Sequence, residues 1–236
     1  MAAGTPLTRR RPRSDGGSVV LLSGGMDSAT CLAIARQRHP PVHALTVLYG
    51  QRHDREVRAA RRLARHFGVL EHTLLRLPLR GLLRSSLTDP SRRLPQGGRS
   101  GRRIPSTYVP ARNTLLLALA LGYAESHGLR HLYLGANAID YSGYPDCRPE
   151  FLRAFERLAM RATRAGTERG VRFHVEAPLL RLSKAQIVRW GDRLGVPWAL
   201  TWSCYAGGAR PCGMCDSCRL RARGFRVARR IDPTVG

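Results

Sequence analysis

The sequence almost lacks lysine: of its 40 basic residues 39 are arginine, and Lys184 is the single lysine. Acidic residues number 16, so the formal net charge is +24 at pH 7. A chain that uses arginine wherever a cation is needed should retain a lysine where a planar guanidinium cannot replace a compact ammonium, as at a phosphate. We therefore predict that Lys184 is a site residue. The alternative is a lysine kept by chance on a solvated helix.

Aromatic residues are scarce, at 6% of the chain, which bears on how the positive charge is interpreted. Five arginines lie on the polar side of one predicted amphipathic helix, the pattern of a solvated face: Arg55, Arg58, Arg61, Arg62 and Arg65. No aromatic side chains are interleaved with them to stack bases. The charge predicts nonspecific attraction to polyanions, and nucleic acid is not expected as the substrate.

Long apolar runs are also absent, because no stretch approaches the roughly 20 apolar residues of a membrane span. Residues 1–18 lack an apolar segment and contain Pro, Gly, Ser and Arg without periodicity. They are predicted to form a flexible basic tail, not a targeting signal. We expect no membrane association and a cytoplasmic location.

Strands and helices are predicted to alternate from residue 19 onward. Short apolar runs predict strands at 19–22, 42–49, 70–75, 131–134 and 173–176, and helical periodicity predicts helices at 29–35, 54–67, 113–126, 150–163 and 183–194. This alternation predicts an α/β fold with a doubly wound, mostly parallel sheet. Ligands bind such sheets outside the carboxyl ends of the strands.

The stretch from Ser23 to Ser28, S-G-G-M-D-S, connects the first predicted strand to the first helix. It lacks the G-K-[ST] of a Walker A loop and the G-x-G-x-x-G of a dinucleotide fingerprint. Two glycines and two serine hydroxyls at a helix N-terminus form a cradle for an anion such as phosphate. An ordinary strand-to-helix turn is the plainer alternative.

Three further polar loops follow strands or open helices, so they are predicted to meet at the same edge of the sheet. They are Tyr49–His53, Val109–Asn113 and Gly135–Arg148. Together they carry amide, guanidinium, carboxylate and phenol groups, which can read the edge of a polar heterocycle. Taken singly, each could be a solvated loop.

Cys204, Cys212, Cys215 and Cys218 follow the spacing C-x7-C-x2-C-x2-C. Four thiolates at this spacing favour tetrahedral Zn²⁺ with no open position, and therefore one structural zinc per chain. Two disulfides are the alternative, less favoured without a secretion signal. Of the remaining cysteines, Cys31 is predicted to be a buried apolar residue, and Cys147 lies in a polar loop.

Several motifs in order resemble the bacterial 7-cyano-7-deazaguanine synthase family of the PP-loop superfamily. They are S-G-G-x-D-S, Y-G-Q-R-H, V-P-x-R-N, D-Y-S-G-Y-P-D-C-R, L-S-K and T-W-S-C-Y to C-D-S-C, spanning about residues 19–233. The resemblance implies a homodimeric zinc protein that acts as an ATP-dependent carbon–nitrogen ligase in queuosine biosynthesis. It would convert 7-carboxy-7-deazaguanine, ammonia and ATP into 7-cyano-7-deazaguanine through adenylated acid and amide intermediates.

The resemblance also implies roles for individual residues. Asp27, Lys184 and Arg112 would be catalytic, with Mg²⁺ as an expected companion of ATP. The nucleotide would contact Leu22, Ser23, Gly24, Gly25, Met26, Asp27, Ser28, Ala29, Thr30, Cys31 and Leu32. The deazaguanine would contact Tyr49, Gln51, Arg52, His53, Asn113, Asn137, Asp140, Tyr144, Asp146 and Arg148.

The expected organisation is a basic tail (1–18), a PP-loop nucleotide-binding α/β domain (19–200) and a zinc-binding module (201–236) packed on that domain. Three other functions remain open. The chain could be a PP-loop enzyme that modifies tRNA, a paralogue that attaches a deazaguanine to a protein, or a noncatalytic zinc module that binds nucleic acid.

Overall fold

The computed structural model describes residues 16–50, 54–79, 82–89, 91–92, 104–138 and 143–234. Within them, five strands form one all-parallel sheet in the order β3-β2-β1-β4-β5. The strands are β1 (Ser18–Leu21), β2 (Val42–Leu48), β3 (Glu71–Arg76), β4 (His131–Tyr133) and β5 (His174–Glu176). The sequence-based prediction of a doubly wound parallel sheet is thus confirmed.

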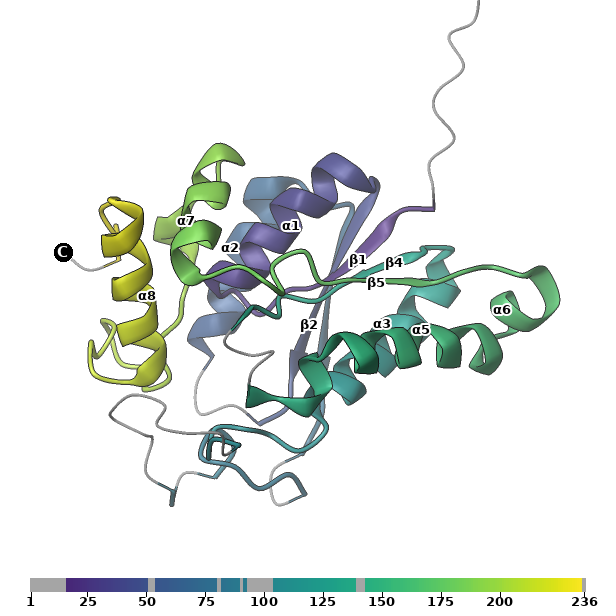
Figure 1. Cartoon of the computed structure of the whole chain (residues 1–236), viewed down its shortest axis with the longest axis horizontal. Coiled ribbons are helices and arrows are strands. Elements are labelled where there is room, and N and C mark those ends of the chain that lie inside the picture. Colours follow the sequence, from purple (N-terminus) through teal and green to yellow (C-terminus); the bar gives the residue numbers. More distant parts are fainter. Residues whose placement is uncertain are drawn as a thin grey trace, which may run out of the picture.

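Helices cover both faces of the sheet (Figure 1). They are α1 (Met26–Arg38), α2 (Arg55–Phe67), α3 (Arg112–His127), α5 (Pro149–Ala162), α6 (Arg164–Arg169), α7 (Lys184–Arg193) and α8 (Asp216–Ala228). Short 3₁₀ turns occupy Pro145–Cys147 and Trp198–Leu200. The α6 and α8 helices were not predicted from the sequence.

Alternating side chains of the central strands divide between two apolar cores, because successive strand residues point to opposite faces. Val20, Ala44 and Tyr133 pack against α1, α2 and α7. Val19, Leu45 and Leu132 pack against α3 and α5 on the other face. A core on each face fixes the register of the sheet, and with it the edge where the strands end.

The segment after α7 returns to this edge. Arg221 of α8 is buried and holds the segment in place: its guanidinium donates to Asp232 at 2.7 and 2.9 Å and to the Thr201 hydroxyl at 2.7 Å. Against α7, a Cβ added to Gly224 would lie 2.8 Å from Lys184 Cβ, so the two helices approach closely there. The C-terminal helix thereby positions the start of α7.

Candidate active site

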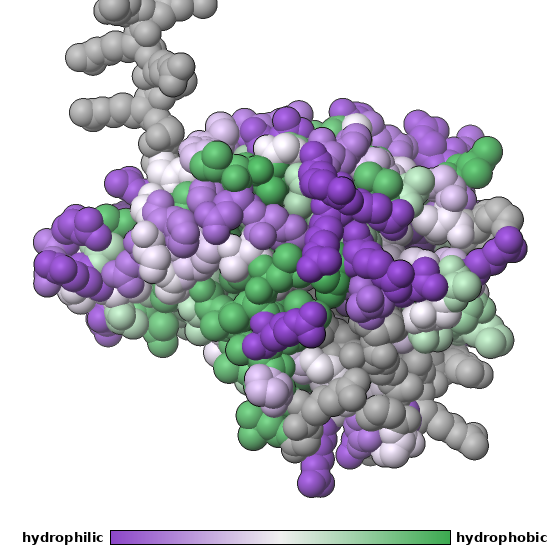
Figure 2. Space-filling view, turned by 180° about the vertical axis from the view of Figure 1, so that it is seen from behind, coloured by the Kyte–Doolittle hydropathy of each residue, from purple (hydrophilic) through white to green (hydrophobic). Residues whose placement is uncertain are grey.

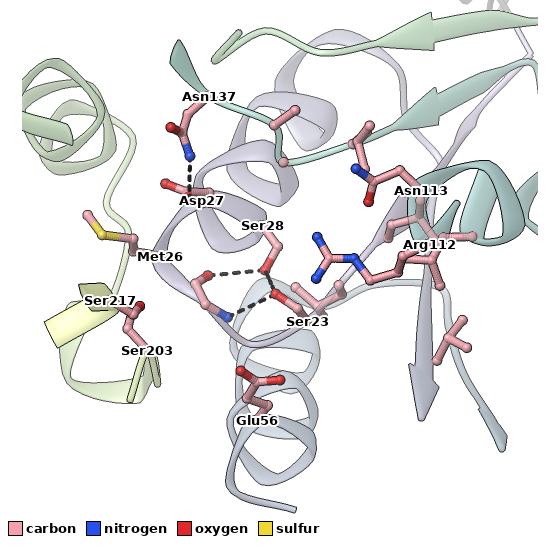
Figure 3. Close-up of a pocket in the computed structure, with 18 of the residues that line it drawn as sticks. Ser23, Met26, Asp27, Ser28, Glu56, Arg112, Asn113, Asn137, Ser203 and Ser217 are labelled. Atoms are coloured by element: carbon pink, nitrogen blue, oxygen red, sulfur yellow. Dashed lines mark hydrogen bonds between the residues drawn. The ribbon is translucent and has the colours of Figure 1, made fainter. Parts of the chain in front are cut away.

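A pocket lies at the carboxyl edge of the sheet, where the polar loops were predicted to converge (Figure 3). The ends of β1 and β2 and the segment after β4 form its floor, and α1, α2, α3 and α7 each contribute residues. Charged side chains in its wall are Asp27, Glu56, Arg112 and Lys184. The pocket therefore combines a helix N-terminus with cations and carboxylates, a set suited to a phosphate-bearing ligand.

The predicted phosphate loop opens helix α1, whose N-cap residue is Gly25. Ser23 Oγ lies 3.1 Å from Ser28 Oγ and accepts a hydrogen bond from the Gly25 amide at 3.3 Å. The Ser28 hydroxyl also lies 3.1 Å from the Gly25 carbonyl oxygen. These short contacts fold the loop around the helix N-terminus, where amide groups and the helix dipole favour an anion.

Only glycine fits position 24, because of its backbone conformation and because a neighbouring backbone atom lies close to it. Its φ is +87°, a region that favours glycine, and an added Cβ would lie 2.3 Å from the Glu56 carbonyl oxygen. From the other side, the Trp202 amide donates to the Gly24 carbonyl at 2.9 Å. The phosphate loop is therefore packed between the start of α2 and the segment that leads to the cysteines.

Asp27 and Lys184, predicted as catalytic, meet in the pocket although they lie far apart in the sequence. Lys184 Nζ donates to Asp27 Oδ2 at 2.5 Å, and Asn137 Nδ2 donates to the same oxygen at 3.2 Å. The other oxygen, Asp27 Oδ1, is buried and has no hydrogen-bond partner among the described residues. A buried carboxylate oxygen in this state is a ready acceptor for a ligand or a cation.

The start of α3 carries the other predicted catalytic cation. Arg112 lies over the Tyr49 ring, 6.0 Å from its centroid, and its Nη1 donates to the Tyr49 hydroxyl at 3.4 Å. The preceding residue, Ala111, has φ 51° and supplies no side-chain cap. Asp146 Oδ2 takes the place of a cap by accepting from the Asn113 amide at 2.8 Å.

Asn113 and its neighbours form a polar part of the pocket wall. The Asn113 side-chain amide donates to Cys147 Sγ at 3.0 Å. Tyr144 stacks with Tyr108, with ring centroids 5.8 Å apart, and its hydroxyl lies 3.1 Å from Thr107 Oγ1. Asn113, Tyr144 and Cys147 all line the pocket, whereas Asp146 is occupied in holding the start of α3.

The predicted site residues differ in where the structure places them. Those that line the pocket are Leu22, Ser23, Gly25, Met26, Asp27, Ser28, Tyr49, Arg112, Asn113, Asn137, Tyr144 and Lys184. Within α1, Ala29, Thr30, Cys31 and Leu32 are buried, and burial raises the pKa of the Cys31 thiol. Arg148 is exposed at the start of α5, and Gln51, Arg52, His53 and Asp140 lie outside the described residues.

Sequence reasoning missed other pocket residues. Ser203, Tyr205 and Ser217 reach the pocket from the segment around the cysteines, although motifs containing them were part of the resemblance. Glu56, in the first turn of α2, was not singled out either. Burial raises its pKa to about 7 even though attraction to Arg112 opposes the shift.

The four predicted ligand cysteines form one cluster. The sulfur atoms of Cys204, Cys212, Cys215 and Cys218 all lie within 4.8 Å of one another. Backbone amides donate to two of them: Cys204 Sγ accepts from Cys212 at 3.3 Å, and Cys212 Sγ accepts from Cys215 at 3.4 Å. A hydrogen bond from Cys218 lowers the pKa of the Cys215 thiol. The cluster is suited to a metal ion with four sulfur ligands.

Helices able to cross a membrane are not found in the described ranges, since none is both long and apolar enough.

Comparison with known proteins assigns the family. The model of the family "Queuosine biosynthesis protein QueC" matches residues 17–229. A 7-cyano-7-deazaguanine synthase from Anaeromyxobacter sp. (strain Fw109-5) is 57% identical over 223 residues, which cover 92% of this chain and 95% of that relative. The synthase from Stutzerimonas stutzeri (strain A1501) is 54% identical, with 92% and 96% covered.

Among solved structures, the NMN synthetase from Francisella tularensis has a TM-score of 0.49 and 16% identity, covering 93% of this chain and 79% of that one.

The family match spans both the predicted phosphate loop and the cysteine cluster. The chain therefore belongs to the family of the queuosine biosynthesis protein QueC.

Proposed function

We propose that the protein converts 7-carboxy-7-deazaguanine, ammonia and ATP into 7-cyano-7-deazaguanine, the product for which its relatives are named. The pocket supports this proposal most directly, because a phosphate loop, two cations and an unsatisfied carboxylate oxygen lie beside a polar wall. Turning a carboxylate into a nitrile requires oxygen to leave twice. Transfer of each oxygen to phosphorus makes it a good leaving group.

In this proposal the substrate carboxylate attacks the α-phosphorus of ATP, and pyrophosphate leaves. The amides at the start of α1, with Ser23 and Ser28, hold the phosphates. Lys184 and Arg112 neutralise the charge that develops on the departing pyrophosphate. Ammonia then displaces AMP to give the amide, and a second activation at the amide oxygen permits loss to the nitrile.

We propose that the deazaguanine lies against the wall formed by Tyr49, Asn113, Asn137 and Tyr144, each of which lines the pocket. Tyr144 offers an aromatic face already stacked on Tyr108. The remaining predicted contacts, with Gln51, Arg52, His53, Asp140, Asp146 and Arg148, stay proposals. For Asp146 the proposed role is indirect, because its carboxylate orients Asn113.

Mg²⁺ is proposed to accompany ATP, and Asp27 fits that ion. One carboxylate oxygen is held by Lys184 and Asn137, while Oδ1 is buried without a partner in the described part of the chain. Carboxylate and phosphate oxygens are the ligands Mg²⁺ takes at nucleotide sites. The ion would supply positive charge between the phosphates.

For the cysteine cluster we propose a single structural Zn²⁺, since four sulfur ligands leave no open position. On this view residues 201–236 form a module packed on the domain of residues 19–200. Because metal binding is coupled to folding, Cys215→Ser should lower zinc content, melting temperature and activity together. Zinc remaining near one per chain, or activity lost with unchanged melting, would contradict a closed structural site.

We also propose a homodimer. Helix α3 presents an apolar stripe to solvent at Leu115, Ala118 and Gly122, and Leu115 is 38% exposed. Figure 2 shows the molecule from behind, and apolar surface gathers across the middle and lower part of that face. Exposed apolar surface of this kind is typical of a contact between subunits. Sedimentation of the protein should give twice the chain mass.

A single assay tests the proposed function. The purified protein is incubated with ATP, ammonium and 7-carboxy-7-deazaguanine, and the products are followed by mass spectrometry. We expect the amide and then the nitrile to form, with AMP and pyrophosphate. Absence of nitrile while added tRNA or a protein becomes modified would overturn the proposal in favour of one of the alternatives.

A further inference from the structure

Glu56 is a carboxylate of the pocket to which no role has yet been given. Its backbone is fixed against the phosphate loop, because its carbonyl oxygen occupies the space beside Gly24. Figure 3 shows its carboxylate extending from α2 toward Ser23 and Ser28, on the opposite side of the loop from Asp27 and Asn137. Glu56 thus faces the region where the nucleotide phosphates are proposed to lie.

The Glu56 carboxylate is not engaged elsewhere. No hydrogen bond or ion pair joins it to another residue in the described ranges, in contrast to nearby Asp54, whose carboxylate accepts from Arg58 at 2.8 Å. The charged side chains that share the pocket are Asp27, Arg112 and Lys184, and Lys184 is already paired with Asp27. Because Asp27 is paired with Lys184 and its other oxygen is proposed to face Mg²⁺, Glu56 is the carboxylate that we consider for a further cationic or proton-donating ligand.

The proposed reaction requires such a ligand. Ammonia is present at neutral pH almost entirely as ammonium, which has no lone pair and cannot attack an acyl-adenylate. Building on the proposed function, we infer that Glu56 binds the ammonium ion at the mouth of the phosphate loop and removes the proton that frees its lone pair. Glu56 is then a catalytic residue that acts as the general base of the amide-forming step.

Ammonium gives one proton to the Glu56 carboxylate and becomes ammonia. The nitrogen lone pair forms the bond to the acyl carbon, the carbon–oxygen bond to the adenylate breaks, and AMP leaves with that electron pair. The second proton, which the new nitrogen carries after attack, passes to water. No oxidant or further co-reactant is needed.

The acid–base character of the site agrees with this assignment. With a pKa of about 7, the Glu56 carboxyl can accept a proton at neutral pH and release it again before the next turnover. The anionic form also supplies the negative charge that attracts ammonium, in a pocket whose other charges, Arg112 and the Lys184–Asp27 pair, sum to one positive charge. Binding and deprotonation are thus done by the same group.

The decisive experiment compares ammonium with hydroxylamine as the nucleophile, in the parent protein and in the Glu56→Gln variant. Glu56→Gln keeps the shape of the side chain but cannot accept the proton. We expect it to retain substrate-dependent exchange of pyrophosphate into ATP within a few fold, and to lose amide formation by about 10²–10⁴-fold, the usual size of a general base effect. Hydroxylamine is largely uncharged at neutral pH, so the variant should form the hydroxamate at a rate within a few fold of the parent.

Two variants and one pH series complete the test. Glu56→Asp should recover part of the amide-forming rate, and Asp54→Asn, the adjacent exposed carboxylate, should behave as the parent. Amide formation by Glu56→Gln should rise with pH as the fraction of free ammonia rises. An equal loss with hydroxylamine, or a loss of pyrophosphate exchange, would overturn the assignment. A parent protein that makes neither amide nor hydroxamate would instead overturn the proposed function.

Discussion

The two ends of helix α1 carry clusters of titratable side chains that differ in how fully their polar groups are paired. The helix is 13 residues long, so its ends are roughly 20 Å apart. At its end, His39 Nδ1 lies 2.8 Å from the Tyr133 hydroxyl and the His39 ring stacks on His131 at 3.5 Å. His131 Nδ1 in turn lies 3.0 Å from Glu176 Oε1. Each of these side chains is thus engaged by a neighbour in the cluster, through a hydrogen bond or ring stacking.

At the start of α1 the polar groups are only partly satisfied. Asp27 Oδ1 is buried without a partner in the described structure, and the Glu56 carboxylate has no ion pair there. Unpaired polar groups cost free energy and persist where a ligand uses them. The contrast indicates that the cluster at the end of α1 stabilises the fold, whereas the cluster at its start serves chemistry. Four substitutions can break or sharpen this contrast.

Asp27→Ala should have the largest effect. The change removes the acceptor of both Lys184 and Asn137 and the oxygen proposed to face Mg²⁺, so we expect adenylate formation to fall by at least about 10³-fold. The side chain lies at a pocket and not in a core, so the melting temperature should change by only a few degrees. Pyrophosphate exchange and a melting curve measure the two quantities. A large loss of stability would show that Asp27 is structural.

Lys184→Arg should reduce turnover by about 10–100-fold, because a planar guanidinium cannot reproduce a point charge at the phosphates. The close approach of Gly224 also leaves little room for rearrangement at this position. A matched control is Arg189→Lys on the same helix, whose exposed side chain donates to the Val227 carbonyl at 2.8 Å. The control should keep its turnover within twofold. Equal turnover for both variants would show that the reaction does not require an ammonium group at position 184.

Much of the fold that carries this contrast could be predicted from the sequence, and the reason is physical. Apolar periodicity located the strands and the helices α1, α2, α3, α5 and α7, and the rule for parallel sheets placed the motif loops at one edge. The helix α6 was missed because its six residues, R-A-G-T-E-R, lack an apolar face. In α8 the many arginines masked the apolar positions that contact α7.

Individual contacts in the site could not be predicted, because they depend on distances between remote segments. The family resemblance implied that Asp146 would contact the deazaguanine, but not that its carboxylate accepts from the Asn113 backbone amide. Glu56 stands on a helix beside five arginines, so it resembled one more polar surface residue. Its place beside the loop of residues 23–28 follows from the packing of Gly24 against the Glu56 backbone, which no local pattern reveals.

Glu176→Gln tests the opposite end of α1. The hydrogen bond from His131 lowers the pKa of Glu176 most strongly, so the folded state gains stability from the ionised carboxylate. That gain is present above the ordinary value of 4.5 and is lost as pH falls through the lowered pKa. We expect a loss of about 2 kcal/mol at pH 7, shrinking toward zero in acid, with turnover unchanged. Denaturant unfolding at several pH values measures it, and a loss of turnover without a loss of stability would reverse the assignment.

On stability, Glu56→Gln should have the smallest effect, and its sign should be opposite to that of Glu176→Gln. The folded pKa of about 7 lies above the ordinary 4.5, so the folded state resists ionisation that the unfolded chain accepts. The parent therefore loses stability as pH rises from 4.5 to 7 and bears the full cost above 7, whereas glutamine bears none. Because the pocket is open to water we expect the variant to be about 1 kcal/mol more stable at pH 8. At pH 4 the two proteins should unfold at the same denaturant concentration. A variant less stable than the parent at pH 8 would mean that the Glu56 carboxylate stabilises the fold, and the two ends of α1 would no longer differ in kind.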